Sequence, residues 1–357
     1  MIATRRRGWI GIDVGTSTVK LVQLIRSRNR IRFAGSAIVP RHRAWPVTDI
    51  PEDQPLSSAD ELHVATSLDA GFRGKRAAAM LPMTVCNVLS VERPTVRQTE
   101  QDRSIRQAIE MATQSSAAHL QYDIWDAETD PKNPAPPKSN VLTVAQSWTD
   151  QLCEDVKQSG WWCQTVDGLP LALARAVAMV DQSDPQTPVA ALDWGYGQAT
   201  LCIVMAGRPV YVRCLKNCGL HVLIEALTDN LNVTAEEAQR VLRDYGIGGT
   251  HGEEAHLATE LIEEIISPSL HHLEEEIRRT ISHLKGQRRS ILPQKMYVFG
   301  GGATVNGLAE YLTRQISLNV SIWQFGSGGV ANSVQPNLPS CLFGPAIALS
   351  ALAWESS

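Results

Sequence analysis

Residues 11–20 read GIDVGTSTVK, and residues 192–200 repeat this pattern in outline as LDWGYGQAT. Each copy combines an apolar strand, an Asp-x-Gly turn and the start of a second strand. Because glycine has no Cβ to block a close approach, such a turn can direct backbone N–H groups into one concavity, which suits a phosphate. The carboxylates of Asp13 and Asp193 would repel a phosphate, so they are better suited to hold a divalent cation through water.

The chain that follows each turn is also duplicated. We predict strands at 18–25 and 31–39 after the first turn, and at 199–205 and 210–215 after the second. A single Asp-Gly turn is typical of an ordinary hairpin. An internal duplication of a whole three-strand unit instead indicates a repeated architecture. Two such turns facing each other would hold the phosphates of a Mg-nucleotide between them.

A third glycine element lies near the end of the chain. Residues 296–299 read as a buried strand, 300–303 as a Gly-Gly-Gly-Ala loop, and 305–316 as a helix with an apolar stripe. This order would place a glycine loop at a helix N-terminus, where the helix dipole favours the anionic part of a nucleotide. No Gly-Lys-Ser/Thr follows the loop, and the first two turns run from strand to strand. A Walker loop and a dinucleotide fingerprint are therefore both excluded.

The three elements, in this order and spacing, resemble those of the actin-like ATPase superfamily. Within it, the chain is similar to the PilM family of type IV pilus assembly, which is related to FtsA. The likeness covers nearly the whole chain. Four motifs beyond the turns carry it: GIDVG followed by VKLV at 19–22, YVR at 211–213 before Gly219, AEEA at 235–238 before Tyr245-Gly246, and GGGA at 300–303 through NGL at 306–308.

The resemblance implies an α/β, two-domain actin-like fold, which is a duplicated ribonuclease H-like fold, with a small αβ subdomain inserted in the first domain. We expect the first domain at 1–187, its insertion at about 92–164, the second domain at 188–357, and a helical side subdomain at about 216–290. The insertion would contain strands and helices on either side of the proline-rich segment 130–137. A connecting helix is expected at 171–180, and a closing helix at 346–354 is expected to pack on the second sheet.

The resemblance also implies ATP and Mg²⁺ as cofactors and assigns the site residues. In that superfamily the lysine that closes the first turn touches phosphate, and Lys20 occupies the matching place. Mg²⁺ would be held through water by Asp13 and Asp193. The nucleotide-binding candidates are Asp13, Gly15, Thr16, Ser17, Thr18, Lys20, Asp193, Gly195, Tyr196, Gly197, Gln198, Gly219, Gly300, Gly301, Gly302 and Ala303.

Hydrolysis is a separate question from binding. Phosphoryl transfer needs a polar residue that orients the attacking water or hydroxyl. In the resembled superfamily this residue lies where the connecting helix begins, and Leu169 stands there, with Asp167 as a nearby catalytic candidate if the register shifts. On the adenosine side, Gln239 and Leu242 replace the usual pattern that ends in a lysine. We therefore expect nucleotide binding with weak ATPase activity at most.

The composition of the chain favours a cytoplasmic protein. It has 357 residues, of which 43% are hydrophobic, and this is enough to bury two cores. The seven cysteines form no Cys-x-x-Cys pair, which favours a reducing compartment. The longest apolar stretch, 341–354, contains Gly344-Pro345 and is too short to span a bilayer.

Charge is distributed unevenly along the chain. The net charge is −4, yet before Asp49 the single acidic residue is Asp13. Two interpretations stay open for the arginines of this region, namely a solvated hairpin tip or a basic face turned toward anionic lipid headgroups. Nucleic acid is not indicated, because no interleaved aromatic residues or known binding module accompany the arginines. The basic residues are Arg5, Arg6, Arg7, Lys20, Arg26, Arg28, Arg30, Arg32, Arg41 and Arg43.

The resemblance implies an ATP-binding adaptor of the inner-membrane platform of a type IV pilus or a related secretion machine. Its partner would be the N-terminal cytoplasmic tail of a PilN-like single-span membrane protein, received between the insertion and the rest of the first domain. This contact would bring the chain to the inner membrane, beside other platform proteins. The alternatives are a small-molecule kinase or ATPase of the same superfamily, or an FtsA-like cell-division protein, although residues 349–357 have no basic face.

Overall fold

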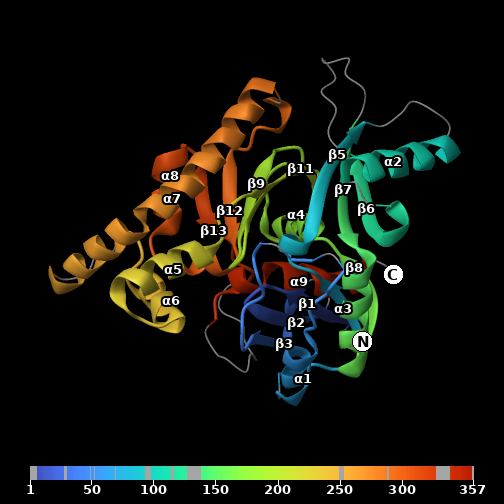
Figure 1. Ribbon diagram of the computed structural model, residues 1–357, viewed down its shortest axis with the longest axis horizontal. Coiled ribbons are helices and arrows are strands. Elements are labelled where there is room, and N and C mark those ends of the chain that lie inside the picture. Colours follow the sequence, from blue (N-terminus) through green and yellow to red (C-terminus); the bar gives the residue numbers. More distant parts are fainter. Residues whose placement is uncertain are drawn as a thin grey trace.

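The computed structural model describes residues 6–27, 30–48, 50–51, 53–68, 70–92, 98–113, 116–126, 138–248, 253–287, 289–326 and 338–355. The proline-rich segment 130–137 of the predicted insertion lies outside these residues. Two five-stranded sheets form the body of the molecule, and one long helix with several shorter ones flanks the second sheet (Figure 1).

The first sheet has the strand order β3-β2-β1-β4-β8. β1 pairs antiparallel with β2 and parallel with β4, and β8 extends the sheet in parallel beyond β4. The register places Asp13 opposite Lys20, so the two side chains at the ends of β1 and β2 are neighbours. The strands are β1 (Arg6–Val14), β2 (Thr18–Ser27), β3 (Arg30–Pro40), β4 (Arg76–Met80) and β8 (Trp162–Asp167).

The second sheet repeats this arrangement in the order β11-β10-β9-β12-β13. Its first three strands form the same antiparallel meander, and its last two are parallel to β9. Here the register places Thr200 opposite Asp193. The predicted duplication of the three-strand unit is thus confirmed. The strands are β9 (Val189–Trp194), β10 (Ala199–Met205), β11 (Arg208–Leu215), β12 (Lys295–Phe299) and β13 (Asn319–Ile322).

Two helices, α4 (Leu169–Val180) and α9 (Gly344–Ala351), pack against each other between the sheets. α4 contacts the meander of the second sheet, whereas α9 contacts β1 and β2 of the first sheet. The prediction that the closing helix packs on the second sheet was therefore wrong. The reason is a close approach to β1: a Cβ on Gly11 would lie 2.0 Å from the carbonyl oxygen of Ala346. The hydroxyl of Ser350 donates to Trp9 O at 2.6 Å and accepts from Leu24 N at 2.9 Å, which holds α9 to the first sheet.

A third sheet, of order β5-β7-β6, stands beside the first and is covered by α2 (Figure 1). Its strands are β5 (Cys86–Glu92), β6 (Leu120–Asp126) and β7 (Lys138–Ala145), and α2 spans Gln98–Thr113. The next helix, α3 (Gln146–Gln158), instead buries Trp148 and Leu152 in the core of the first sheet. β8 belongs to the first sheet as well, so only part of 92–164 forms the separate sheet. The domain boundaries themselves stay a prediction.

The third sheet also contacts the second sheet. The indole Nε1 of Trp125 donates to Pro209 O at 2.5 Å, and Asn140 Nδ2 donates to Val210 O at 3.4 Å. Both acceptors belong to β11. The predicted insertion therefore bridges to the edge of the second sheet.

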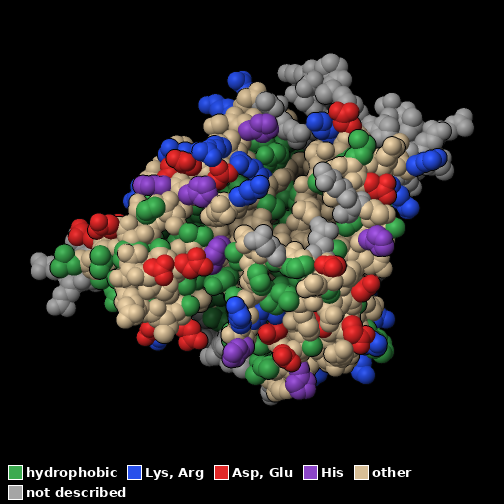
Figure 2. All heavy atoms as spheres, in the orientation of Figure 1, with side chains coloured by type: hydrophobic (Ala, Val, Ile, Leu, Met, Phe, Trp, Pro, Cys, Tyr) green, Lys and Arg blue, Asp and Glu red, His purple; other side chains and the backbone are tan. Residues whose placement is uncertain are grey.

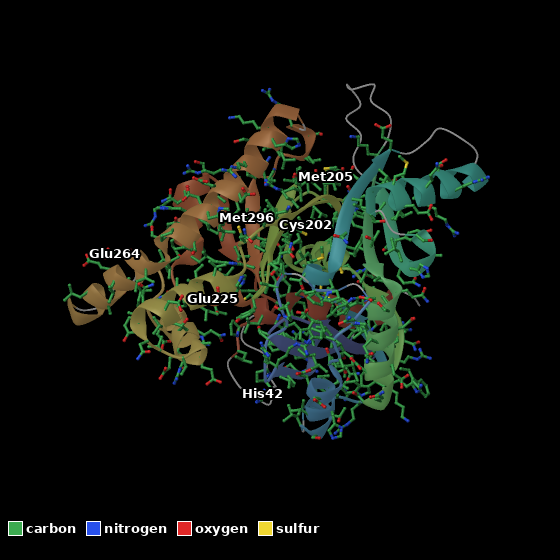
Figure 3. All side chains as sticks on the ribbon, in the orientation of Figure 1. His42, Cys202, Met205, Glu225, Glu264 and Met296 are labelled. Carbon is green, nitrogen blue, oxygen red and sulfur yellow. The ribbon has the colours of Figure 1, made fainter. Side chains whose placement is uncertain are left out.

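The side helices lie over the second sheet, and the longest, α7, runs obliquely across it (Figure 1). α6 begins with a capping box in which Thr234 and Glu237 exchange hydrogen bonds. The buried side chain of Met296 packs in the core under these helices, whereas that of Cys202 lies on the opposite face of the second sheet, in the core that contains α4 and α9 (Figure 3). The helices are α5 (Leu220–Leu231), α6 (Ala235–Asp244), α7 (Glu253–Gln287) and α8 (Leu308–Ile316), with α1 (Ala59–Ser67) on the first sheet.

Short 3-10 turns complete the fold: η1 (Met83–Val85), η2 (Ala117–His119), η3 (Arg289–Ile291), η4 (Gly301–Thr304), η5 (Ser340–Phe343) and η6 (Leu352–Trp354). Within the ranges that the structure describes, no helix combines the length and the apolarity that a bilayer span requires.

Candidate functional site

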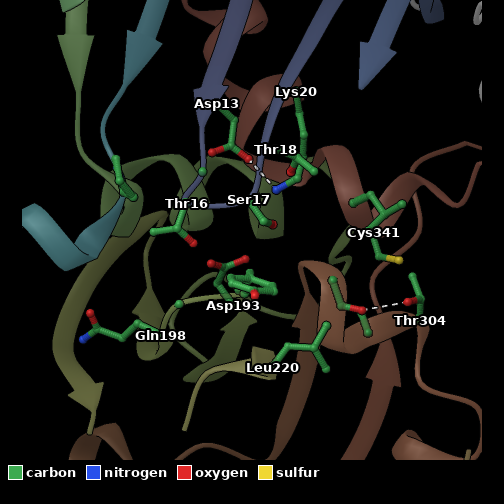
Figure 4. Close-up of a pocket in the computed structure, with 18 of the residues that line it drawn as sticks. Asp13, Thr16, Ser17, Thr18, Lys20, Asp193, Gln198, Leu220, Thr304 and Cys341 are labelled. Carbon is green, nitrogen blue, oxygen red and sulfur yellow. Dashed lines mark hydrogen bonds and ion pairs between the residues drawn. The ribbon is translucent and has the colours of Figure 1, made fainter. Parts of the chain in front are cut away.

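A cavity of ≈ 480 Å³ lies between the two sheets, where the β1–β2 and β9–β10 turns face each other (Figure 4). The structure brings most of the predicted site residues to its wall. These are Asp13, Gly15, Thr16, Ser17, Thr18, Lys20, Asp193, Gly195, Tyr196, Gly197, Gln198, Gly301 and Ala303. Gly219, Gly300, Gly302 and Asp167 do not line it.

The two turns have the same backbone hydrogen bond. Gly15 N donates to Thr18 O at 2.9 Å, and Gly195 N donates to Gln198 O at 3.1 Å. A Cβ on either glycine would meet that same carbonyl oxygen, at 2.8 Å for Gly15 and 3.1 Å for Gly195. A side chain would therefore clash with the closure of the first turn and crowd that of the second, whether or not a ligand approaches.

The carbonyl groups of the first turn are held from behind by residues of the loop after β3. Gly15 O accepts from Arg41 Nε at 3.0 Å and Thr16 O accepts from Trp45 N at 2.8 Å. Ser17 O accepts from Arg41 N at 2.9 Å. In a trans peptide the N–H points opposite to the carbonyl of the preceding residue. The N–H groups that follow these three carbonyls therefore point away from the loop after β3, whose Arg41 and Trp45 do not line the cavity.

Arg41 was counted among the exposed basic residues on sequence grounds, and the structure shows a different role. Its guanidinium is buried, donates to Glu61 at 2.7 Å and to Ser58 at 2.9 Å, and lies 3.9 Å from the ring centroid of Trp45. The sequence patterns did not reveal that Arg41 and Trp45 support the first turn, because no local motif marks a loop as the support of a distant turn.

The second turn has an equivalent support from the start of α5. Gly195 O accepts from Leu220 N at 3.0 Å, and Tyr196 O accepts from His221 N at 3.0 Å. Gly219 makes this approach possible, since a Cβ there would lie 2.5 Å from Tyr196 O. The predicted nucleotide-binding residue Gly219 thus lies behind the turn, where it positions the backbone.

The charged side chains of Asp13, Lys20 and Asp193 point into the cavity (Figure 4). Lys20 Nζ lies 3.1 Å from Asp13 Oδ2. Burial alone would lower the pKa of Lys20, but the carboxylates of Asp13 and Asp193 outweigh it and hold that pKa above its usual value. Burial raises the pKa of Asp193 to about 7, with Lys20 opposing this shift and Asp13 adding to it. One lysine therefore offsets the negative charge of two carboxylates.

The third glycine element differs from its prediction. Residues Gly301–Thr304 form the 3-10 turn η4, and α8 begins only at Leu308. The glycine loop therefore does not lead directly into a helix N-terminus. The glycines allow η4 to pack on the end of β9: a Cβ on Gly302 would lie 2.2 Å from the ring of Trp194, and Gly300 has a φ of 82°.

Opposite η4, helix α6 supplies Gln239, Leu242 and Arg243 to the cavity wall. Thr304, whose hydroxyl donates to Gly301 O at 2.7 Å, faces them from η4. The sequence patterns did not single out Arg243 or Thr304. This side of the cavity therefore has a mixed apolar and polar wall.

The place expected for catalysis carries no group that can orient water. Leu169 lines the cavity and is 4% exposed. Asp167 lies outside the wall, in an ion pair with Arg175 at 2.5 Å. Among the residues that the structure describes, Asp13 and Asp193 are the carboxylates of the lining, and no cluster of three His, Cys, Asp or Glu side chains suits a metal.

Comparisons with known proteins agree with this architecture. The chain is similar to a solved structure of the PilM-PilN type IV pilus biogenesis complex, with a TM-score of 0.73 and 20% identity over 97% of this chain and 98% of that one. It is also similar to the ethanolamine utilization protein EutJ from Carboxydothermus hydrogenoformans, with a TM-score of 0.54 and 14% identity over 97% and 89% of the two chains. MreB 5 of Spiroplasma citri bound to AMPPNP gives a TM-score of 0.50 and 11% identity over 98% of each chain.

These likenesses confirm the predicted actin-like fold class. A search of curated protein sequences gives no match. The family model of the type IV pilus assembly protein PilM matches residues 11–337. Because this match covers most of the chain, the protein belongs to the PilM family of type IV pilus assembly proteins.

Proposed function

We propose that this chain binds Mg-ATP in the cavity and acts as an adaptor of the inner-membrane platform of a type IV pilus or a related secretion machine. One observation carries the proposal: the carbonyl groups of both turns are held from behind, which turns the N–H groups away from these supports, and both turns line one cavity together with Lys20. Backbone N–H groups and a lysine are suitable donors to phosphate oxygens. The triphosphate would lie between the two turns.

Asp13 and Asp193 would hold Mg²⁺ through water. Their fit to a divalent cation rests on charge, since two carboxylates share the single lysine and the pKa of Asp193 is raised to about 7. Mg²⁺ prefers oxygen ligands and keeps several waters, which suits two carboxylates on opposite walls. When bound, the ion neutralises phosphate charge.

We propose that turnover is weak. Phosphoryl transfer needs a side chain that orients the nucleophile, and an apolar Leu169 occupies that part of the wall while Asp167 is paired with Arg175. This arrangement favours a nucleotide that acts as a structural or switching ligand. It disfavours the kinase alternative, which needs a carboxylate base in the cavity in addition to those that hold the metal.

We further propose that the cytoplasmic N-terminal tail of a PilN-like single-span membrane protein docks between the third sheet with its helix α2 and the rest of the first domain. The support is the solved PilM-PilN complex to which the chain is similar. α2 also presents Met111, whose side chain is 76% exposed. This contact would place the chain in the cytoplasm at the inner membrane.

Nucleotide binding is tested by thermal unfolding with Mg-ATP. At about one hundred times the dissociation constant, the ligand should stabilise the fold by about 2.7 kcal/mol. Gly301→Val should remove this shift, because the new side chain enters the cavity and its Cβ meets only the flexible Leu220 Cδ2, at 3.2 Å. Gly286→Val is the matched control, since a Cβ there meets no atom within 4 Å.

A melting temperature that Mg-ATP leaves unchanged would contradict nucleotide binding. Steady turnover of about 1 s⁻¹ or faster, typical of a working kinase, would contradict the adaptor role.

Partner docking is tested with a synthetic cytoplasmic tail of the membrane partner. Met111→Asp should weaken tail binding, because a charge would replace an exposed apolar contact on α2. Leu257→Asp on α7 is the matched control, since Leu257 is 68% exposed and lies in the second domain. If the Leu257 variant loses the tail and the Met111 variant keeps it, the docking site is misplaced.

A further inference from the structure

Exposed cations gather at the end of the first sheet that lies opposite the cavity. β1 and β4 begin at this end, and the β2–β3 hairpin turns there. The register places Arg6 opposite Arg26, and Arg76 beside Trp162. Eight exposed cations, which we call the basic edge, come from these segments: Arg6, Arg7, Arg26, Arg30, Arg32, Arg73, Lys75 and Arg76.

The basic edge lacks acidic partners. Among the described residues, none of its eight cations forms an ion pair. The arginines of α7 behave differently, since Arg278 pairs with Glu274 at 2.9 Å and Arg279 with Glu276 at 2.6 Å. Figure 2 shows Lys and Arg side chains mixed with Asp and Glu over this helix. Like charges directly opposite each other in a sheet are destabilising, so the pairing of Arg6 with Arg26 does not serve the stability of the fold.

A buried amide holds the basic edge in place. Gln23 is 2% exposed, and its Nε2 donates to Gly8 O at 3.0 Å and to Arg73 O at 2.7 Å. Its Oε1 accepts from Arg73 N at 2.8 Å and from Arg7 Nη1 at 3.4 Å. One side chain thus ties β1, β2 and the loop before β4 together. The cations of the basic edge therefore project from backbone segments that are held together.

An exposed tryptophan completes the surface. Trp162 is 58% exposed and is the one large aromatic side chain so exposed among the described residues. Lys75 Nζ lies 5.7 Å from its ring centroid, and Trp162 N donates to Lys75 O at 2.6 Å. An indole beside cations is typical of the boundary between headgroups and acyl chains. Stacking on single-stranded nucleic acid uses several aromatic side chains instead.

We propose that the basic edge binds the surface of an anionic lipid membrane directly, with Trp162 inserted among the headgroups. The proposal goes beyond the adaptor role, because it gives the chain a membrane contact that needs no protein partner. The cavity lies at the other end of β1 and β2, so nucleotide exchange stays open while the edge is engaged.

The test is co-sedimentation of the full chain, without any partner, with vesicles of phosphatidylcholine alone or mixed with phosphatidylglycerol. The protein should bind the anionic vesicles and be released by high salt. The triple variant Arg30→Gln, Arg32→Gln, Arg76→Gln should bind about 100-fold more weakly, because each cation near the surface is worth roughly a fivefold change. The matched control removes three exposed cations of the second domain: Arg208→Gln, Arg240→Gln and Arg314→Gln.

Three outcomes would overturn the proposal. They are equal binding of the wild-type chain to both kinds of vesicle, an equal loss in the control variant, and binding to duplex DNA without binding to anionic vesicles. If the triple variant fails to fold, vesicle binding is measured instead for Trp162→Ala and for the wild-type chain at low and high salt. Binding to anionic vesicles that neither Trp162→Ala nor high salt weakens would then overturn the proposal. A negative result for the basic edge does not affect the Mg-ATP proposal, because the basic edge and the cavity wall share no residue.

Discussion

The two turns that face each other across the cavity have the same backbone but different side chains around them. Asp13 and Asp193 precede the turns at equivalent positions, and both turns close with the same hydrogen bond. The residue opposite the carboxylate is Lys20 in the first sheet and Thr200 in the second. The hydrogen bonding of the two turns is alike, while a cation faces the carboxylate across the two strands in the first sheet and not in the second.

Their supports differ as well. The first turn is held by the loop after β3 through Arg41 and Trp45, whereas the second is held by the first residues of α5. A change in α5 would therefore reach the second turn directly. We infer that the first turn supplies charge and a rigid wall, and that the second turn links the cavity to the side helices.

The largest expected effect comes from removing the lysine. Lys20→Met leaves two buried carboxylates without their cation, and breaking a buried pair in this way should lower the free energy of unfolding by about 3 kcal/mol. The Mg-ATP stabilisation should also disappear. Urea unfolding in the presence of a chelator measures the first effect. Unfolding at the wild-type urea concentration would mean that Lys20 does not balance the charge of the cavity.

The next effect tests the support of the second turn. Gly219→Ala places a Cβ 2.5 Å from Tyr196 O, so the turn or α5 must shift. We expect a loss of about 2 kcal/mol in the free energy of unfolding, in the range of other overpacked sites, and much weaker nucleotide binding. The comparison variant is Gly301→Ala, whose Cβ meets only a flexible leucine at 3.2 Å. Equal stabilities of the two variants would show that α5 does not position the turn.

A smaller effect comes from the titration of Asp193. Burial raises its pKa from 3.8 to about 7, so between these values the folded chain keeps a proton that the unfolded chain has released. The free energy of unfolding should fall as pH rises through this window and level off above it. Asp193→Asn has no such proton, so its free energy of unfolding should not change through this window. Between about pH 5 and pH 8 the variant should therefore become more stable relative to the parent by about 1 kcal/mol. This value is reduced because the carboxylate faces cavity water. Chemical unfolding of both proteins at both pH values, without Mg²⁺, measures this change. A stability difference between variant and parent that does not change with pH would contradict the prediction.

The features that the two sheets share could be predicted from the sequence, whereas the different supports of the two turns could not. Alternating strands and Asp-x-Gly turns are local patterns, so both meanders and both turns were found at their places. The roles of Arg41 and Gly219 depend on contacts with turns far away in the sequence, and no local pattern shows them. The position of α9 depends on Gly11 of β1, more than three hundred residues before Ala346, so an apolar helix alone could not reveal which sheet it covers.

The smallest expected effect comes from the position that matches Lys20. Thr200 is 1% exposed, lines the cavity and pairs with Asp193 across the two strands. Its side chain is uncharged and cannot offset the charge of Asp193. Thr200→Val keeps the shape and β-branching of the side chain and removes one hydroxyl, so the free energy of unfolding should change by less than about 1 kcal/mol. The Mg-ATP thermal shift should stay as in the parent. If Thr200→Val instead abolishes that shift as Lys20→Met does, the hydroxyl contributes to the ligand site, and the functional asymmetry between the two turns is smaller than their charges indicate.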